Sequence, residues 1–234
     1  MYLNIEICIT DELFSKYSVN DRIVAGNLAK GAFKSILRRS SNLTKQVLSF
    51  SDFIFATDPG YLVFATQHGE LQRTLKLLYS VAEQTELSPT QFAQSVHSTA
   101  PGLLTIANEK QVPFTTICAG DETFCMAMIE AIAHLRNNHQ SEVCVIFADD
   151  KVPDDLIDGI DDTDQYSLAV KLRCDGPYTV EISKNEVKDV AERLQNKRNV
   201  RQMLESVSTL SEFNLISSSL NLKWKLSSND IKTS

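Results

Sequence analysis

The run of residues from 113 to 148 constrains the fold of this chain more than any other feature. Pro113–Cys118 is a short apolar and β-branched segment that predicts a strand, and Gly120 marks its end. Beyond Asp121, one apolar stripe follows the helical spacing: Phe124, Met128, Ala131, Ile132 and Leu135. Val143–Ala148 is an unbroken apolar run, typical of a strand buried on both faces. Strand, helix and strand in this order predict a βαβ unit and a parallel sheet covered by helices.

The region before this unit contains further predicted elements. Arg22–Arg39 has the periodicity of an amphipathic helix. Asp52–Thr57 and Tyr61–Thr66 are aromatic and β-branched runs around an Asp-Pro-Gly turn, which predict two strands and suggest a hairpin. A helical pattern runs from Gly69 to Leu87, and Ser88 is placed to cap a second, short helix.

An acidic segment follows the βαβ unit, with eight aspartates between positions 149 and 164. A calcium-binding EF-hand loop needs acids at alternate positions, a central Gly and a closing Glu. Here Gly159 is misplaced and no Glu closes the loop. We therefore interpret the segment as a solvated acidic loop.

The C-terminal part predicts three more kinds of element. Ser167–Arg173 and Tyr178–Ile182 resemble a pair of strands, and residues 186–205 a polar helix. Residues 219–226 alternate between apolar and polar side chains, as a half-buried strand does. We divide the chain into a domain of residues 1–174 and a C-terminal segment of residues 175–234.

Composition and charge exclude several classes of protein. The chain has 23 Lys and Arg against 30 Asp and Glu, and its net charge of −7 argues against nucleic acid as a partner. The first residues contain acids where a secretory signal is basic, and no stretch of about 20 residues is apolar enough for a membrane span. The five cysteines lack the CxxC spacing of metal and redox sites. We expect a cytoplasmic protein with no metal and no cofactor.

The usual catalytic motifs do not occur in the sequence. Each of the four histidines is interpreted as a surface or core residue. Cys118 precedes a predicted helix, where a thiolate is stabilised, but its place in an apolar strand favours an inert, buried thiol.

Three segments carry a family resemblance: Ala65-Thr66-Gln67-His68-Gly69, Ser95-Val96-His97 with Gly102, and Ala119-Gly120-Asp121 with Phe124 and Glu130-Ala131. They resemble the ATxHG, SVHxxxxG and AGDxxF…EA segments of ketosynthase-like proteins that carry only the N-terminal half of a β-ketoacyl synthase. Such proteins accompany aryl polyene and related fatty-acid or polyketide gene sets and are often described as chain length factors. The resemblance implies a truncated thiolase-like α/β fold, with a mixed sheet covered by helices. It makes His68, Gly69, His97 and Gly120 motif residues.

The resemblance also implies that the catalytic nucleophile is lost. Condensing enzymes carry an acyl-accepting Cys at the start of the helix, and the ungapped match places Asp121 there. Cys118 stands three residues too early and Cys125 four residues too late. The two further active-site residues of such enzymes, usually His, come from the C-terminal half of the full fold. We expect this chain to lack them and to be a non-catalytic subunit.

A complete β-ketoacyl synthase is the implied partner, in a heterodimer or larger assembly with acyl carrier protein nearby. In thiolase-fold enzymes, the strand before the nucleophile pairs with its counterpart in the other subunit. By resemblance this interface strand consists of Phe114, Thr115, Thr116, Ile117 and Cys118. Glu122 and Phe124 would then line the acyl tunnel of the partner.

Three alternatives stay open. Asp121 is equally well read as a carboxylate that only stabilises a helix N-terminus. The chain could instead be a small acyl-transfer or thioester-hydrolysing enzyme that uses Cys118 or Cys125. Basic residues at positions 30, 34, 38 and 39 could meet an acidic carrier protein, although a plain solvated face is the favoured reading.

Overall fold

The computed structural model describes residues 2–9, 31–139, 141–156, 165–174, 176, 178–184, 199–203, 205, 213–216 and 220–226. Its strands form one sheet in the order β3-β2-β4-β5-β1-β6-β8-β7. The strands are β1 (Tyr2–Ile9), β2 (Tyr61–Ala65), β3 (Phe114–Ile117), β4 (Glu142–Asp149), β5 (Tyr166–Cys174), β6 (Tyr178–Lys184), β7 (Phe213–Ile216) and β8 (Leu220–Leu226). Strand β2 is parallel to both β3 and β4, and the other pairings are antiparallel. The predicted mixed α/β sheet is confirmed.

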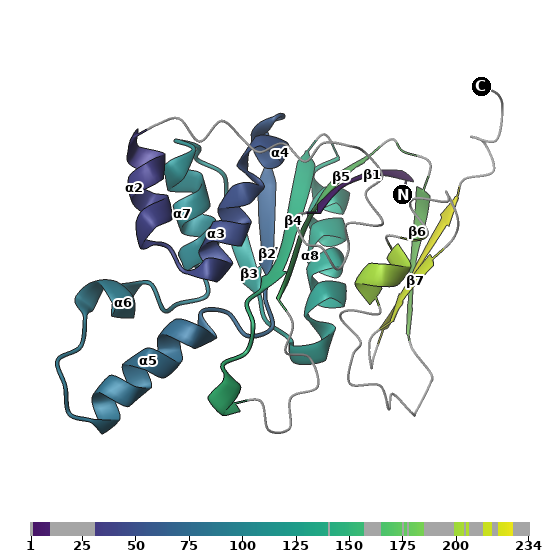
Figure 1. Ribbon diagram of the computed structural model, residues 1–234. Helices are drawn as coiled ribbons and strands as arrows, with labels where there is room; N and C mark the ends of the chain where they lie inside the picture. Colours follow the sequence, from purple (N-terminus) through teal and green to yellow (C-terminus); the bar gives the residue numbers. More distant parts are fainter. Residues whose placement is uncertain are drawn as a thin grey trace.

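Helices cover both faces of the sheet (Figure 1). One face carries α2 (Gly31–Arg39), α3 (Asn42–Ser49), α4 (Ser51–Phe55) and α7 (Thr99–Ala107), and the other carries α8 (Thr123–Asn137). Each face has its own apolar core, because successive side chains of β2 point to opposite sides. Leu62 and Phe64 pack toward α3 and α7, whereas Val63 and Ala65 pack toward α8.

The βαβ unit has the predicted form. All five residues of the predicted stripe on α8 are buried, and every residue of β4 is buried as well. The strand that α8 connects to β4 is β3, and β2 lies between the two. This places β3 at the edge of the described sheet, with its four residues half-buried.

The predicted hairpin at residues 52–66 is wrong. Only β2 is a strand; residues 51–55 form the short helix α4, and β2 pairs in parallel with β3 and β4. Phe50 and Ile54 lie one helical turn apart, and both are fully buried against the sheet. Burial at helical spacing therefore overrides the β propensity of the aromatic run.

Other predictions at the two ends of the chain have mixed outcomes. Strands β5, β6 and β8 match the expected segments, and α2 confirms the last part of the predicted helix at 22–39. Residues 22–30 lie outside the described part, as does most of the predicted helix at 186–205, of which 199–203 are helical. β6 and β8 continue the same sheet as β1 and β5. The division of the chain at residue 174 stays a prediction.

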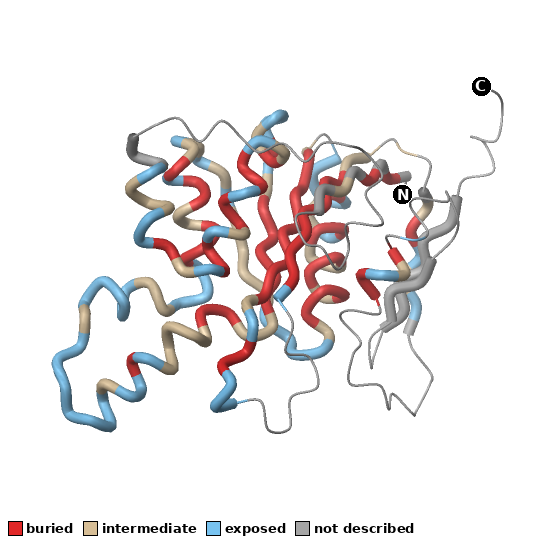
Figure 2. The backbone as a smooth tube through the Cα atoms, in the orientation of Figure 1, coloured by how far each residue is buried: buried red, intermediate tan, exposed pale blue. Residues whose placement is uncertain are grey.

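Two helices project from this body as an arm. The helical arm, residues 71–93, consists of α5 (Leu71–Ala82), a loop, and α6 (Pro89–Ala93) (Figure 1). The predicted cap of its second helix is confirmed, because the Ser88 side chain accepts a hydrogen bond from the backbone N–H of Gln91. Most of the outer half of the arm is exposed, as the pale blue tube in Figure 2 shows.

Candidate functional site

The three motif segments meet at one end of the sheet. Parallel strands β2, β3 and β4 point the same way, so residues 65–69, 118–121 and 149 all lie at their carboxyl ends. In open α/β sheets, ligands bind at this end, outside the carboxyl ends of the parallel strands. The second motif arrives from the arm, since His97 follows α6 and precedes α7.

Asp149 holds the first motif in place. Its carboxylate is 1% exposed. One oxygen accepts hydrogen bonds from the Thr66 hydroxyl at 2.7 Å and the His68 N–H at 2.8 Å. The other accepts from the Gln67 N–H at 2.8 Å and the Tyr166 hydroxyl at 3.1 Å. Three residues of the motif loop, residues 66–69, therefore donate hydrogen bonds to one buried carboxylate, which fixes the conformation of the loop.

The surroundings of Asp149 shift its protonation in two opposing ways. Burial raises the pKa of the Asp149 carboxyl, while the hydrogen bonds from the backbone of Gln67 and His68 and from Thr66 lower it, and burial dominates. The interpretation of Asp149 as part of a solvated acidic loop is wrong. It is the last residue of β4, and the strand carries it into the interior. Residues 157–164 of that segment lie outside the described part of the chain.

Gly69 and His97 join the first two motifs. Gly69 has a φ of +59°, which favours glycine, and an added Cβ would lie 3.0 Å from Cδ2 of His97. The His97 ring thus packs on the space that Gly69 leaves open. The segment that leads into the helical arm and the segment that leads out of it are therefore in contact at this point.

Asp121 and Cys118 join the third motif to the first through Gln67. The Gln67 side-chain amide donates to Asp121 Oδ1 at 3.0 Å, and the Cys118 thiol donates to the Gln67 carbonyl at 3.3 Å. Asp121 is exposed, in a short 3-10 turn (Gly120–Glu122) that starts with Gly120 at a φ of +56°. The thiol of Cys118 is exposed, so the expectation of a buried thiol is wrong.

The turn before α8 is stabilised by another residue. The Thr123 hydroxyl accepts from the Ala119 N–H at 2.9 Å and donates to the Gly120 carbonyl at 2.7 Å. The hydrogen bond of Asp121 is made to Gln67 and not to the N-terminus of α8. Asp121 therefore contacts the motif loop, and its interpretation as a carboxylate that only stabilises the helix N-terminus stays an open alternative.

The two predicted tunnel residues differ in position. Glu122 is half-buried beside Asp121. Phe124 is 0% exposed. The centroid of its ring lies 5.2 Å from that of Phe147, and the Phe147 centroid lies 5.1 Å from that of Tyr166. Phe124 is thus a core residue of this chain. A role for either residue in a partner's acyl tunnel stays a prediction.

The remaining candidates for nucleophilic chemistry are dispersed. Cys125 lies in the first turn of α8 and is fully buried in the core. His134 stacks on Tyr61 at 4.1 Å near the opposite end of β2, far along α8 from Asp121. In the described part of the chain, His, Cys, Asp and Glu side chains form no cluster that could hold a metal ion.

A buried charge lies at the far end of the same strands. Lys171 is almost fully buried; its ammonium donates to the Thr57 hydroxyl at 2.8 Å, lies 3.7 Å from Glu142 Oε1 and sits above the Phe53 ring. Glu142 begins β4 and Asp149 ends it, so each end of this central strand carries a buried carboxylate.

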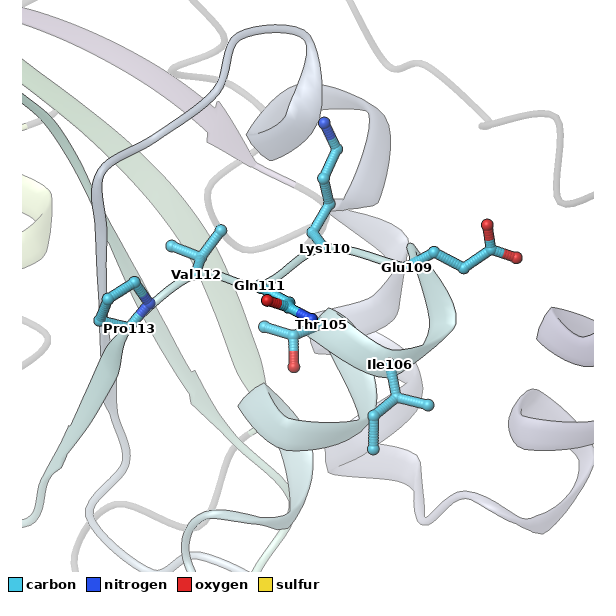
Figure 3. A pocket seen from close by; sticks show the side chains of 7 residues that line it. All are labelled: Thr105, Ile106, Glu109, Lys110, Gln111, Val112 and Pro113. Carbon is cyan, nitrogen blue, oxygen red and sulfur yellow. The ribbon is translucent and has the colours of Figure 1, made fainter.

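An open groove of about 690 Å³ lies beside the start of β3 (Figure 3). The end of α7 and the loop that enters β3, up to Pro113, line it. Lys110 at this groove is paired with Asp58 at 2.6 Å. Because Pro113 precedes β3, the groove lies at the opposite end of that strand from the motif cluster.

The fold and the converging motifs define a condensing-enzyme-like class of protein. The chain belongs to the β-ketoacyl synthase N-terminal domain family, whose model matches residues 32–228. The predicted family is thereby confirmed. A comparison with curated proteins finds no match.

Solved structures show the same fold. A chain from "Ketosynthase (ApeO) in Complex with its Chain Length Factor (ApeC)" of Xenorhabdus doucetiae has a TM-score of 0.74 at 19% identity, covering 96% of this chain and 99% of that one. The ishigamide ketosynthase/chain length factor has a TM-score of 0.51 at 15% identity, covering 70% of this chain and 55% of that one. A β-ketoacyl synthase from Burkholderia phymatum STM815 has a TM-score of 0.50 at 8% identity, covering 76% and 55%. These similarities establish the thiolase-like fold.

A helix that crosses a lipid bilayer must be both long and apolar. None of the helices in the described ranges combines the two properties to the extent required.

Proposed function

We propose that this chain is a non-catalytic, chain-length-factor-like subunit that pairs with a complete β-ketoacyl synthase. The proposal includes a place in aryl polyene or related biosynthesis, with acyl carrier protein nearby. The observation that carries it is the exposed carboxylate of Asp121, hydrogen-bonded to Gln67 at the position where, by the resemblance, condensing enzymes carry their acyl-accepting Cys.

The chemistry of a carboxylate supports this reading. An acyl group on Asp121 would be a mixed anhydride, far more labile than the thioester on a cysteine. The thiol of Cys118 donates its proton to the Gln67 carbonyl and not to an imidazole, so this contact does not activate it as a nucleophile. Cys125 is buried away from any substrate. A growing chain would therefore be carried by the partner.

The position of β3 supports the predicted pairing. Edge strands expose unpaired N–H and C=O groups, and natural proteins cover them or pair them. Strand β3 has β2 on one side and the margin of the described sheet on the other. Phe114, Thr115, Thr116 and Ile117 are half-buried there, and Cys118 follows at the exposed end. The Xenorhabdus complex consists of a ketosynthase and its chain length factor, which agrees with this proposal.

Co-expression with a complete β-ketoacyl synthase from the same genome tests the proposal. We expect the two chains to co-purify, and we expect Asp121→Ala to leave condensation by the complex within about twofold of wild type. Loss of condensation in an intact Asp121→Ala complex would show that the carboxylate takes part in the reaction. A wild-type chain that purifies as a folded monomer in the presence of the ketosynthase would contradict the pairing.

The exposed thiol of Cys118 favours one alternative, a small cysteine-dependent acyl-transfer or thioester-hydrolysing enzyme. Intact-mass measurement after incubation with an acyl thioester separates the two functions. We expect no covalent adduct on the wild-type chain. An adduct that disappears in Cys118→Ala but persists in Cys174→Ala would support the enzyme instead.

A further inference from the structure

The helical arm exposes more large apolar side chains than any other part of the described chain. Leu78 is 59% exposed, Val81 58% and Phe92 65%, and Tyr79 and Leu87 are exposed as well. All five lie between the two motif segments at residues 69 and 97. A concentration of exposed large apolar side chains in one segment is typical of an interaction site in a globular protein.

The outer half of the arm has no core of its own. From residue 81 to residue 93, every residue except the half-buried cap Ser88 is exposed. Helices of this length are marginal in water by themselves, and most helical stability in proteins comes from packing an amphipathic face. The exposed apolar side chains Leu78, Val81 and Phe92 therefore need a surface that the described part of this chain does not supply.

The base of the arm is fixed by buried polar contacts. Glu70 is buried and accepts hydrogen bonds from the hydroxyls of Ser41 at 2.6 Å and Thr44 at 2.9 Å. Arg73 lies 3.4 Å from Glu70 and donates to the Gln94 side chain at 2.9 Å, so the two ends of the arm are linked. The arm is thus presented in one direction from the body, as Figure 1 shows.

The base of the arm lies close to the end of the predicted interface strand. The end of β3 leads to Cys118 and Asp121, both bonded to Gln67, and Gln67 lies only a few residues before α5. A stable protein interface uses roughly 20 to 30 residues on each side. The four residues of β3 supply a small part of that number, and the arm leaves the body close to the end of this strand.

We infer that the helical arm is a second docking surface for the ketosynthase partner, with Leu78, Val81 and Phe92 as its apolar contacts. This inference rests on the proposed function. The tip of the arm also carries the exposed acids Glu83 and Glu86. The matching surface of the partner is therefore an apolar groove with basic residues at its rim.

The test uses the full chain and a complete β-ketoacyl synthase from the same genome. Phe92→Asp and Val81→Asp place a charge on the arm without touching a buried residue, so both variants should keep the wild-type melting temperature. Each should weaken binding at least about tenfold in isothermal titration or surface plasmon resonance, because buried aromatic and apolar anchors dominate interfaces. Phe92→Leu, which keeps an apolar contact, should lose less. Ala133→Asp adds the same charge at an exposed position of α8, on the other side of the sheet, and should bind as wild type does.

Three other results would each contradict a different step. Wild-type affinity in Phe92→Asp and Val81→Asp would remove the arm from the interface while leaving the proposed function intact. Failure of the wild-type chain to bind any ketosynthase would overturn the proposed function, and with it the identity of the partner. Concentration-dependent self-association of the wild type that is lost in Phe92→Asp would show that a second copy of this chain covers the arm instead.

Discussion

Replacement of Asp149 tests whether one buried carboxylate organises the motif cluster. In Asp149→Ala, four donors lose their acceptor. The hydroxyls of Thr66 and Tyr166 can rotate to other partners, but the N–H groups of Gln67 and His68 are fixed by the backbone. An unsatisfied buried donor costs about 1–3 kcal/mol, and removal of the buried charge offsets part of this. We expect a net loss of about 2–4 kcal/mol.

Asp149→Asn should fall between wild type and Asp149→Ala. The amide keeps one oxygen for two of the donors, and its NH₂ group can donate to the Tyr166 hydroxyl. The NH₂ group still faces the Gln67 N–H, so one pair of donors is left in contact, at a cost of about 1–2 kcal/mol. Tyr166→Phe removes a single hydrogen bond and should cost about 0.5–1.5 kcal/mol.

Thermal denaturation followed by circular dichroism measures this order. For chains of this size 1 kcal/mol shifts the melting temperature by roughly 2–4 °C, so Asp149→Ala should melt roughly 4–16 °C below wild type. Asp154→Ala, an exposed aspartate on the neighbouring loop, is the control and should stay within about 0.5 kcal/mol of wild type. If Asp149→Ala were no less stable than Asp149→Asn, the hydrogen bonds to the motif loop would not be what stabilises the fold at this position.

The stability that Asp149 contributes should depend on pH, and the direction of this dependence follows from the shift of its pKa. Burial raises the pKa of Asp149 above its ordinary value of 3.8, so the folded state binds this proton more tightly than the unfolded state. The contribution of the carboxyl to stability is therefore greatest below pH 3.8 and falls as pH rises toward the raised pKa. Wild type should lose stability relative to Asp149→Asn over that interval, as measured by urea midpoints. The opposite slope would mean that the four hydrogen bonds outweigh burial.

Three further substitutions test neighbouring features. Gly69→Ala should lower the free energy of unfolding by about 1–2 kcal/mol because of the positive φ at this position, as measured by thermal denaturation. Adding His97→Ala to the same chain should restore only the part of this loss that comes from the close contact with the His97 ring. Full recovery would contradict the backbone as the cause. Glu70→Ala leaves the hydroxyls of Ser41 and Thr44 without their acceptor and should speed amide exchange across residues 71–93, whereas Glu70→Gln should preserve most of the protection. Lys171→Met removes one of the two cations beside the buried Glu142 carboxylate and should lower the free energy of unfolding by about 1–3 kcal/mol, as measured by urea denaturation. Adding Glu142→Gln to the same chain should restore part of this loss. Additive losses in the double variant would show that the two charges do not interact.

The parts of the fold that can be predicted from the sequence are those with a clear period. The stripe on α8 and the apolar run of β4 each specify one element and its burial. Strand β1 is absent from the predicted elements, although Leu3, Ile5 and Ile7 alternate with polar residues as a strand does. Its partners β5 and β6 lie more than 150 residues away, so no neighbouring turn marks it as half of a pair. Helix α4 is mistaken for a strand because five residues are too few for propensity to distinguish the two.

The functional site also contains parts that can be predicted from the sequence and parts that cannot. The motif segments are recognisable because they are local in sequence, but the residues that hold them together are not. Asp149 resembles its acidic neighbours, since nothing in a run of aspartates distinguishes the one at the end of a buried strand. Gln67 and Tyr166 acquire their roles only through contacts across the sheet. One signal is available: an acid directly after an unbroken apolar strand lies at the carboxyl edge where the neighbouring parallel strands also end.

The contact between Gly69 and His97 has a consequence for how such subunits diversify. Because the chain leaves and re-enters the body at one point, everything between these two residues is an excursion that the sheet does not depend on for its own pairing. Insertions, deletions or new side chains in this excursion can therefore change the exposed surface of the arm while the pairing of the sheet stays unchanged. Under the proposed function, this would separate the choice of partner from the stability of the sheet.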